Sequence, residues 1–470
     1  MPKRRKKIIE GVKAIDLGDK GQTIGKTPEG EVVIINGGCV PGDVIDYVAL
    51  RKKKGLKFGI TKDVVEFSKD RVEPVCQHFG TCGGCKWQNL SYEAQLKYKH
   101  QYVVQAIRRI AKDDETKVSD IVGCDQLYQY RNKLEYSFST KRWLTVEEIE
   151  SGEDYGNEQG LGFHVAGAFD KVLNIEKCHL QDDYTNKIRN TIRILAREHN
   201  WTYYDIRNHK GLLRNVMIRN TSTGSWMFTM IFGADDKKAI SNFFDVMMPL
   251  FPEINAWHYI INTKANSSTA DLQSVHVAGD ENIIENIGAL KFYISPKSFF
   301  QTNSFQTQKL YDIAKNLADL KPTDVLYDLY TGTGSIALYL AFDCNKVVGI
   351  EQIPEAIADA HRNAALNNIT NADFLVGDVR DVLDVSFRDR YGTPDVIVTD
   401  PPRAGMHSDV VETLLELCPP KIVYISCNPS TQARDIALLK EKYKLVQVVP
   451  VDMFPHTSHI ESVALLQLPS

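Results

Sequence analysis

Cys427 is the residue whose type and surroundings best suit covalent chemistry. It follows the apolar run Ile422–Ser426, and the pair Asn428-Pro429 after it predicts a turn at the rim of a site. The structural alternative is a buried thiol that packs as a small hydrophobic group. A thiolate at such a rim can add to C6 of a uracil ring, which converts C5 from a poor nucleophile into an enolate carbon that attacks a methyl donor.

This chemistry also needs a base, because the C5 proton must leave before the thiol can be eliminated. Glu461 is the candidate, in the run His459-Ile-Glu461 at the start of the last predicted strand. Considered alone, Glu461 is more simply an ordinary exposed carboxylate.

A turn with two glycines after the predicted strand Val325–Leu329 indicates a nucleotide site. Its sequence is Tyr330-Thr-Gly332-Thr-Gly334-Ser335. The glycines let the backbone approach a ligand beside a helix N-terminus. The same pattern fits the dinucleotide fingerprint of NAD enzymes, so the turn alone does not choose the ligand.

Carboxylates follow the next two predicted strands. Glu351 can accept hydrogen bonds from ribose hydroxyls, and Asp378 lies where an adenine contact is expected. The structural alternative for both residues is capping of a helix N-terminus.

Two prolines follow the fourth predicted strand, in the run Asp400-Pro-Pro-Arg403. They cannot continue a strand ladder, so they predict a rigid ledge at the end of the strand. Amino-group methyltransferases carry an aromatic residue where this chain has Arg403, which disfavours amino methylation.

These residues all follow strands of one predicted sheet. From about residue 303, apolar strands alternate with amphipathic helices, which is typical of a doubly wound parallel α/β sheet with ligands at the carboxyl ends of its strands. A final hairpin resembles the ending of the Rossmann-like methyltransferase fold. The predicted strands are 325–329, 347–350, 374–376, 396–399, 422–426, 445–451 and 462–468, and the predicted helices are 303–320, 354–366, 410–417 and 431–440.

At roughly 150 residues per domain, 470 residues suggest about three domains. Residues 1–68 predict a small β-barrel of the oligonucleotide-binding (OB) type, residues 69–295 an α+β domain, and residues 296–470 the α/β domain. In the first two regions we expect strands at 32–35, 44–50, 133–139, 216–220, 226–232 and 256–262, and helices at 91–112 and 185–198. The helix at 91–112 can pack on the C-terminal domain.

Charge is unevenly distributed. Residues 1–75 carry 16 Lys/Arg against 11 Asp/Glu, and the remainder carries 40 against 49. The runs Lys3–Lys7 and Arg51–Lys54 can neutralise phosphates, although solvated tails and hairpin tips carry such runs too. The net charge of −4 argues against a simple nucleic-acid coat protein. No apolar run approaches the ~18 residues of a membrane helix, and no signal-peptide pattern follows the basic start, so we expect a cytoplasmic protein.

Three of the nine cysteines lie within ten residues, as Cys76-x5-Cys82-x2-Cys85. In a chain without an export signal such a cluster indicates metal ligands, and with a fourth thiolate it could hold Zn²⁺. Cys82 and Cys85 could instead form a redox pair.

Together these motifs are similar to those of the RNA uracil-5 methyltransferase family, in particular its 23S ribosomal RNA branch with an N-terminal TRAM domain. The resemblance spans the chain and is strongest over 76–88 and 296–470. It implies that Cys427 is the nucleophile and that Glu461 removes the C5 proton. The expected product is 5-methyluridine in 23S ribosomal RNA, and no protein partner is implied.

The resemblance also implies S-adenosylmethionine as the methyl donor. Family members often have Asn where this chain has Ser335, so that contact departs from the family pattern. The expected cofactor contacts are Gln301 in the segment Phe299–Asn303, then Tyr330, Gly332, Gly334, Ser335, Glu351, Asp378 and Asp400.

For the cysteine cluster, the resemblance implies a structural [4Fe–4S] cluster held by Cys76, Cys82, Cys85 and the distant Cys178. Cys124 is the alternative fourth ligand. Structural zinc stays open, because the spacing of the cysteines does not choose the metal.

RNA is expected to bind the TRAM-like barrel and the middle region. Residues 128–133 and 213–219 interleave aromatic or apolar side chains with cations, which suits unstacked single-stranded RNA. Ordinary amphipathic strands show the same pattern. The target uridine must leave its stack to reach Cys427.

Other functions fit the motifs less well. A 5-methylcytosine enzyme would carry a cysteine in the turn that here holds Arg403. Bacterial tRNA enzymes of the same family usually lack the TRAM domain and the cysteine cluster, although an archaeal type keeps them. A radical methylthio enzyme would show C-x3-C-x2-C ahead of a C-terminal TRAM domain. A non-catalytic RNA-binding protein or an NAD oxidoreductase leaves Cys427 without a role.

Overall fold

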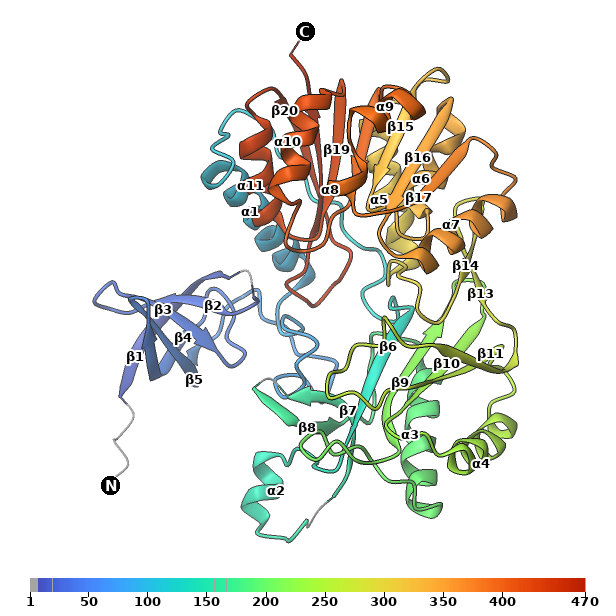
Figure 1. Cartoon of the computed structure of the whole chain (residues 1–470). Coiled ribbons are helices and arrows are strands. Elements are labelled where there is room, and N and C mark those ends of the chain that lie inside the picture. The colour runs from blue at the N-terminus through green and yellow to red at the C-terminus, as the bar shows by residue number, and fades with distance from the viewer. Residues whose placement is uncertain (1–6, 19, 156–157, 166, 470) are drawn as a thin grey trace. The chain divides into compact units, whose positions relative to one another are not determined.

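In the computed structural model, which describes residues 7–18, 20–155, 158–165 and 167–469, five strands at the N-terminus close into a barrel. Side chains along each strand alternate between the interior and solvent, and the inward ones include Val12, Val33, Ile45 and Tyr47. The strands pair in the order β1-β2-β3-β5-β4 (Figure 1). They are β1 (Ile8–Leu17), β2 (Thr23–Lys26), β3 (Val32–Asn36), β4 (Val44–Lys53) and β5 (Leu56–Glu66). The predicted barrel is confirmed.

The basic run Arg51–Lys54 lies at the tip of the β4–β5 hairpin. Lys53 pairs with Leu56, and the two residues between them, Lys54 and Gly55, both take left-handed backbone angles (φ 49° and 82°). Such angles at both central positions are typical of a tight hairpin turn. The other predicted basic run falls largely on residues 3–6, which lie outside the described residues.

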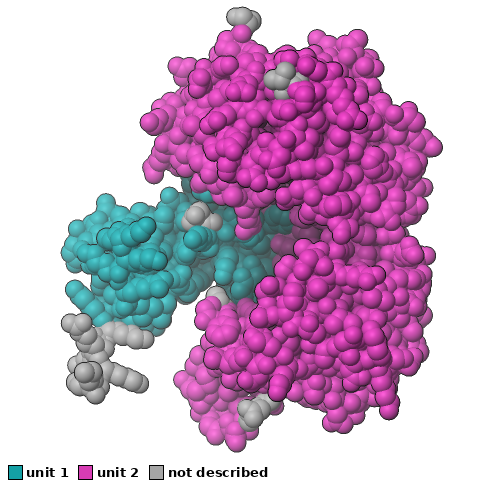
Figure 2. Space-filling view, in the orientation of Figure 1, with its two compact units in different colours: residues 1–102, 454–459 teal, residues 103–453, 460–470 magenta. Residues whose placement is uncertain are grey.

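The chain divides into two units of dense contacts, Met1–Tyr102 with Phe454–His459, and Val103–Met453 with Ile460–Ser470 (Figure 2). The first unit therefore contains a loop from near the C-terminus. In that unit the His456 carbonyl accepts hydrogen bonds from the N–H groups of Lys86 and Trp87 at 2.8 and 3.1 Å. Gln95 Oε1 accepts one from the His456 N–H at 2.8 Å, and the buried Lys99 ammonium donates to the Phe454 carbonyl at 3.0 Å.

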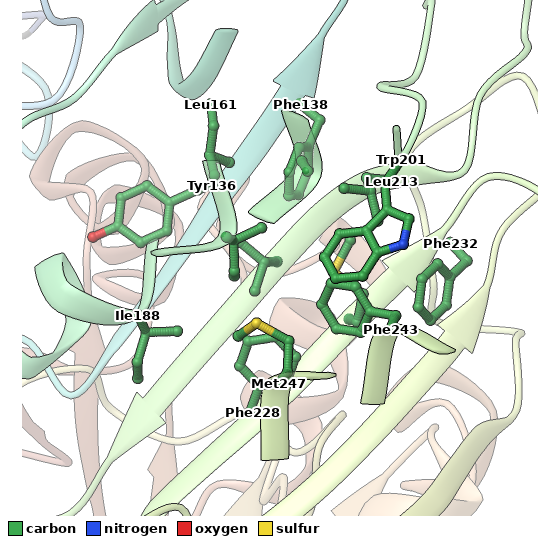
Figure 3. Packing of buried hydrophobic residues seen from close by; sticks show 14 of the residues in the cluster. Tyr136, Phe138, Leu161, Ile188, Trp201, Leu213, Phe228, Phe232, Phe243 and Met247 are labelled. Carbon is green, nitrogen blue, oxygen red and sulfur yellow. The ribbon is translucent and has the colours of Figure 1, made fainter. Parts of the chain in front are cut away.

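A seven-stranded sheet forms the middle of the chain, in the order β12-β11-β10-β9-β6-β7-β8. Two amphipathic helices, α3 and α4, bury their apolar stripes against it, and Figure 3 shows rings such as Phe228 and Phe243 packed there. Two predicted strands, 133–139 and 226–232, have the observed bounds. The elements are β6 (Lys133–Ser139), α2 (Val146–Ser151), β7 (Gly160–Val165), β8 (Ala168–Asn174), α3 (Asp183–Glu198), β9 (Leu213–Asn220), β10 (Trp226–Phe232), α4 (Lys237–Met247), η1 (Met248–Leu250), β11 (Ala256–Ile261) and β12 (Ser274–Gly279).

A short hairpin leads to the C-terminal sheet, whose order is β17-β16-β15-β18-β19-β21-β20. The first five strands are parallel, and β21 runs antiparallel to both of its neighbours, so the predicted doubly wound sheet with a final hairpin is confirmed. Helices lie on both faces (Figure 1). The elements are β13 (Ile283–Ile287), β14 (Leu290–Ile294), α5 (Ser304–Ala318), β15 (Val325–Leu329), α6 (Ser335–Leu340), η2 (Ala341–Asp343), β16 (Lys346–Glu351), α7 (Pro354–Leu366), β17 (Ala372–Val376), α8 (Val379–Val382), α9 (Val385–Tyr391), β18 (Val396–Thr399), α10 (Ser408–Leu417), β19 (Lys421–Ser426), α11 (Pro429–Leu439), β20 (Lys444–Val451) and β21 (Glu461–Gln467). The remaining helix, α1 (Tyr92–Arg109), begins in the first unit and ends in the second.

The outer strand β20 is paired along part of its open edge. The N–H groups of Ser119 and Val122 donate to the carbonyls of Val448 and Pro450 at 2.8 and 2.9 Å. This pairing reduces the number of unpaired backbone groups at the edge of the sheet. None of the described helices combines the length and hydropathy needed to cross a membrane.

Candidate active site

The turn after β15 makes a cradle beside the N-terminus of α6. Tyr330, Gly332 and Gly334 all take left-handed backbone angles (φ 64°, 56° and 78°). Gly334 is also required by packing, because a Cβ there would lie 3.0 Å from Phe374. Among the described residues, no heavy atom lies within 4 Å of a Cβ placed on Gly332, so this position faces open space that a ligand can use.

Asp328, the fourth residue of β15 and the first residue of the motif that runs into the glycine turn, is a buried carboxylate beneath this cradle. Its Oδ2 accepts hydrogen bonds from the Thr331 hydroxyl at 2.6 Å and the Ala337 N–H at 3.1 Å. Within the described part of the chain its Oδ1 has no hydrogen-bond partner. Burial raises the pKa of Asp328 to about 7, against the hydrogen bond from Thr331.

Glu351 ends β16 next to the same turn. Its Oε2 accepts from the Gly332 N–H at 3.2 Å and its Oε1 from the Ile353 N–H at 3.0 Å. The structure therefore brings together the glycine turn and the second-strand carboxylate that the sequence pairs.

Asp378 follows β17 and caps the N-terminus of α8, as the structural alternative for this residue predicted. It also pairs with the Arg380 guanidinium at 2.6 Å, and the hydrogen bond from Arg380 is the main cause that lowers the pKa of Asp378. Asp378 also borders a pocket of about 610 Å³. Other residues that line this pocket include Tyr330, Gln352, Val379, Pro402, Met406 and Arg434.

Gln301 and Ser335 lie in the same unit. Gln301 is buried, and its carbonyl accepts from Asn132 Nδ2 at 2.9 Å. The Ser335 hydroxyl is 2.7 Å from the hydroxyl of Tyr311, a buried α5 residue that was not predicted. Nothing in the sequence around Tyr311 links it to a turn 24 residues away.

Cys427 and Glu461 are placed by the pairing of β19 with β21. Ser426 pairs with Ser462 in this antiparallel ladder. Cys427, which follows Ser426, therefore faces Glu461, which precedes Ser462, at the end of the ladder. The buried Gln432 Nε2 donates to the carbonyls of Tyr424 (2.8 Å) and Ser462 (3.1 Å), one on each strand, which fixes the register.

Burial at this end disfavours the charged forms of the thiol and of the carboxyl groups. Burial, then the Glu461 charge, raises the pKa of the half-buried Cys427 to about 11, and Arg403 opposes this. Burial, then the neighbouring Asp400, holds the pKa of Glu461 well above its usual range. Burial raises the pKa of Asp400 to about 7. The interpretation of Glu461 as an exposed carboxylate is wrong, because its side chain is buried.

The cysteines of the predicted metal site lie in both units. Cys76, Cys82 and Cys85 belong to the first unit, and Cys178 belongs to the second, where its N–H donates to Asn186 at 2.8 Å. Within the described residues, no group of three or more His, Cys, Asp or Glu side chains is arranged to hold a metal ion. Cys124 is buried and donates to the Gln126 carbonyl at 3.1 Å.

In the stretches expected to contact RNA, two arginines have structural roles. Arg214 is buried and donates to the carbonyls of Asn262 and Lys264 at 2.6 and 2.7 Å. Arg219 is buried and donates to the Ser298 carbonyl at 2.9 Å. For these two residues the amphipathic-strand alternative is right. Burial, then Arg219, lowers the pKa of the half-buried Lys133 to about 8.

A glycine turn beside a helix N-terminus, at one edge of a doubly wound sheet with a final antiparallel hairpin, is typical of Rossmann-like methyltransferases. The family model of tRNA (Uracil-5-)-methyltransferase matches residues 273–468. A Bacteroides thetaiotaomicron protein described as an uncharacterized RNA methyltransferase is 47% identical over 453 residues, 96% of this chain and 99% of that protein. A Porphyromonas gingivalis protein of the same description is 45% identical and spans 91% of this chain and 94% of its own length.

Among solved structures, the chain is similar to the Pyrococcus abyssi tRNA (uracil-54, C5)-methyltransferase in complex with S-adenosyl-L-homocysteine. The identity is 27% and the TM-score 0.74, and the match covers 97% of this chain and 100% of that one. The chain therefore belongs to the RNA uracil-5 methyltransferase family. It is an S-adenosylmethionine-dependent RNA (uracil-5-)-methyltransferase.

Glu351→Gln should weaken binding of S-adenosylhomocysteine by about 10- to 100-fold, because a charge-assisted hydrogen bond to a ribose hydroxyl would become a neutral one. Isothermal titration calorimetry measures this without RNA. Glu355→Gln, at an exposed position in the first turn of α7, is the matched control and should bind as the unchanged protein does. Equal affinities for all three proteins would remove Glu351 from the cofactor site.

Proposed function

We propose that this protein methylates C5 of a uridine in 23S ribosomal RNA through a covalent bond between the Cys427 sulfur and C6, giving 5-methyluridine. The observation that carries the proposal is the β19–β21 register, because it sets Cys427 opposite Glu461 at the edge of the sheet that bears the glycine turn. The proposed nucleophile is Cys427 and the proposed base is Glu461. We propose that the protein acts in the cytoplasm.

The residues of the turn fit S-adenosylmethionine. Asp328 Oδ1 is a buried acceptor with no donor among the described residues, the space at Gly332 is open, and Glu351 stands beside both. When bound, S-adenosylmethionine supplies a methyl group made electrophilic by its sulfonium sulfur. We propose that the residues that hold it are Gln301, Tyr330, Gly332, Gly334, Ser335, Glu351, Asp378 and Asp400.

The raised pKa values of Cys427 and Glu461 order the first proton transfers. Burial favours the protonated form of Glu461, which can donate to O4 of the uracil ring. Asp400, with a pKa of about 7, can take the thiol proton as the Cys427 sulfur bonds to C6. The C5=C6 electron pair moves toward O4, and C5 becomes the nucleophile.

The same groups complete the reaction. C5 bonds to the methyl carbon as the bond between that carbon and the sulfonium sulfur of the methyl donor breaks. The electron pair of the broken bond stays on the donor sulfur. The proton on O4 is released to water. Glu461, now ionised, accepts the C5 proton, the C5=C6 bond re-forms and the C6–S bond breaks. The Cys427 thiolate then regains its proton from Asp400, which restores the starting charges.

The test of this function is mass mapping of ribosomal and transfer RNA from cells with and without the protein. Loss of one or more 5-methyluridines from 23S ribosomal RNA is the expected result. Transfer RNA is the second candidate substrate, because the similar Pyrococcus abyssi structure is described as a tRNA enzyme. Loss from transfer RNA alone would establish that alternative, and no loss from either RNA would contradict both.

We propose that the chain has three domains, 1–68, 69–295 and 296–470. We also propose that Cys76, Cys82, Cys85 and Cys178 hold a [4Fe–4S] cluster with a structural role. The support is the thiolate chemistry and the spacing of three cysteines in one loop of the first unit. No step of the reaction is assigned to the cluster. Iron and acid-labile sulfide near four per chain after anaerobic purification would support it, and one zinc per chain without sulfide would replace it with structural zinc.

A further inference from the structure

The loop after β18, residues 401–407, is fastened to the start of α11. Asn428 Nδ2 donates to the Arg403 carbonyl at 3.0 Å, and the Thr431 hydroxyl donates to the same carbonyl at 3.2 Å. Asn428 directly follows Cys427 in the chain. The backbone of Arg403 is therefore tied to the residues that follow the thiol.

A second pair of α11 side chains holds the rest of the loop. Arg434 donates to the carbonyls of Ala404 and Met406 at 3.0 and 3.2 Å. The Asp435 carboxylate is buried, and its Oδ2 accepts from the Met406 N–H at 2.9 Å and from the Tyr424 hydroxyl at 2.7 Å. Its Oδ1 accepts two hydrogen bonds from the Arg434 guanidinium at 2.6 and 2.8 Å.

Gly405 shows how closely the loop lies against this pair. Its φ is 80°, and a Cβ there would lie 2.6 Å from both an Arg434 guanidinium nitrogen and Asp435 Oδ2. A side chain at this position would displace the Arg434 and Asp435 side chains that hold the loop. The contact between loop and helix thus has little freedom to shift.

The loop matters for the chemistry because it carries Arg403. The Arg403 side chain acts on the Cys427 sulfur through a hydrogen bond and through its charge, and both lower the pKa of the thiol. Its charge also lowers the pKa of Glu461. A cation at this position favours the thiolate, whereas Glu461 and Asp400 disfavour it.

We propose that Asp435 and Arg434 are positioning residues that hold the loop after β18 so that the Arg403 side chain meets the Cys427 sulfur. This inference rests on the proposed role of Cys427 as the nucleophile. In this proposal Asp435 and Arg434 act on the thiol only through Arg403.

The test is the pH dependence of Cys427 alkylation by iodoacetamide, followed by mass spectrometry on the peptide that contains this residue. Asp435→Asn places an amide where the carboxylate binds the loop. It should raise the apparent thiol pKa by about 0.5–1 unit and slow alkylation at pH 8 by about 3- to 10-fold. Arg434→Ala should act in the same direction. Lys440→Gln, which removes an ion pair with Asp113 at the other end of α11, is the control and should leave the rate unchanged.

A double-mutant cycle separates positioning from general loosening of the fold. Arg403→Gln should slow alkylation to a similar degree, and adding Asp435→Asn to it should change nothing further. An unchanged alkylation profile in Asp435→Asn, or the same slowing with and without Arg403, would overturn the proposal. If Asp435→Asn does not fold, Arg434→Ala decides: slower alkylation of Cys427 supports the proposal and an unchanged alkylation rate contradicts it.

Because the alkylation assay uses no RNA and no methyl donor, it is independent of the proposed reaction. A thiol whose reactivity depends on Asp435 and Arg403, in a protein whose deletion removes no 5-methyluridine, would leave the positioning role intact and refute the function.

Discussion

Replacing Cys427 by Ser or Ala should abolish methyl transfer to RNA, with a fall of about 10⁴-fold or more in the rate. Without the sulfur no bond to C6 can form, so C5 keeps its low nucleophilicity. The measurement is transfer of label from tritiated S-adenosylmethionine to RNA. A second measurement is the covalent complex with 5-fluorouridine RNA, in which fluorine at C5 cannot leave as a proton and the adduct is trapped.

The matched control for this variant is Cys418→Ser. Cys418 is also half-buried, but it ends α10 and its thiol donates to the Leu415 carbonyl at 2.8 Å. The control should retain full transfer and full adduct formation. Adduct formation by Cys427→Ala, or loss of the adduct in Cys418→Ser, would show that Cys427 is not the nucleophile.

Glu461→Gln should have a different outcome, because it removes the base but leaves the nucleophile. The adduct should form, receive the methyl group and then persist, so that turnover falls by about 100-fold or more while labelled RNA stays bound to protein in denaturing gels. Glu441→Gln, at an exposed position after α11, is the matched control and should turn over normally. Rapid release of methylated RNA from Glu461→Gln would remove Glu461 from its role.

The Glu461→Gln variant also has an expected pH signature. The ionised Glu461 carboxylate raises the pKa of the Cys427 thiol, so its removal lowers that pKa below about 11 and increases the thiolate fraction wherever Glu461 would be ionised. Alkylation of Cys427 in the unchanged protein should therefore rise about tenfold per pH unit up to pH 11, and Glu461→Gln should react faster at pH 10. Slower alkylation of the variant at pH 10 would contradict this electrostatic account.

Strands and helices with strong hydrophobic periodicity could be predicted closely. The strands at 325–329 and 396–399 are apolar runs bounded by polar residues, and both have the observed bounds. The helix predicted at 431–440 begins at Pro429 instead. The prediction counted Asn428-Pro429 as a turn, although proline suits the first position of a helix and Asn428 is the cap.

The convergence of the site could also be predicted, because parallel strands end at one edge and the motifs follow strands. The supporting contacts could not. Gln432 joins Tyr424 to Ser462, and Tyr311 meets Ser335, across 30 and 24 residues of chain. Such contacts depend on how strands and helices stack, which periodicity does not specify. The burial of Glu461 was missed for the same reason.

The loop 454–459 belongs to the unit formed by residues 1–102, although it lies near the C-terminus of the chain. This loop leads directly into Glu461, yet its hydrogen-bond partners are Lys86, Trp87, Gln95 and Lys99, more than 350 residues earlier. A truncated enzyme that begins after residue 102 would keep every predicted catalytic residue but lose the support of the segment before its base.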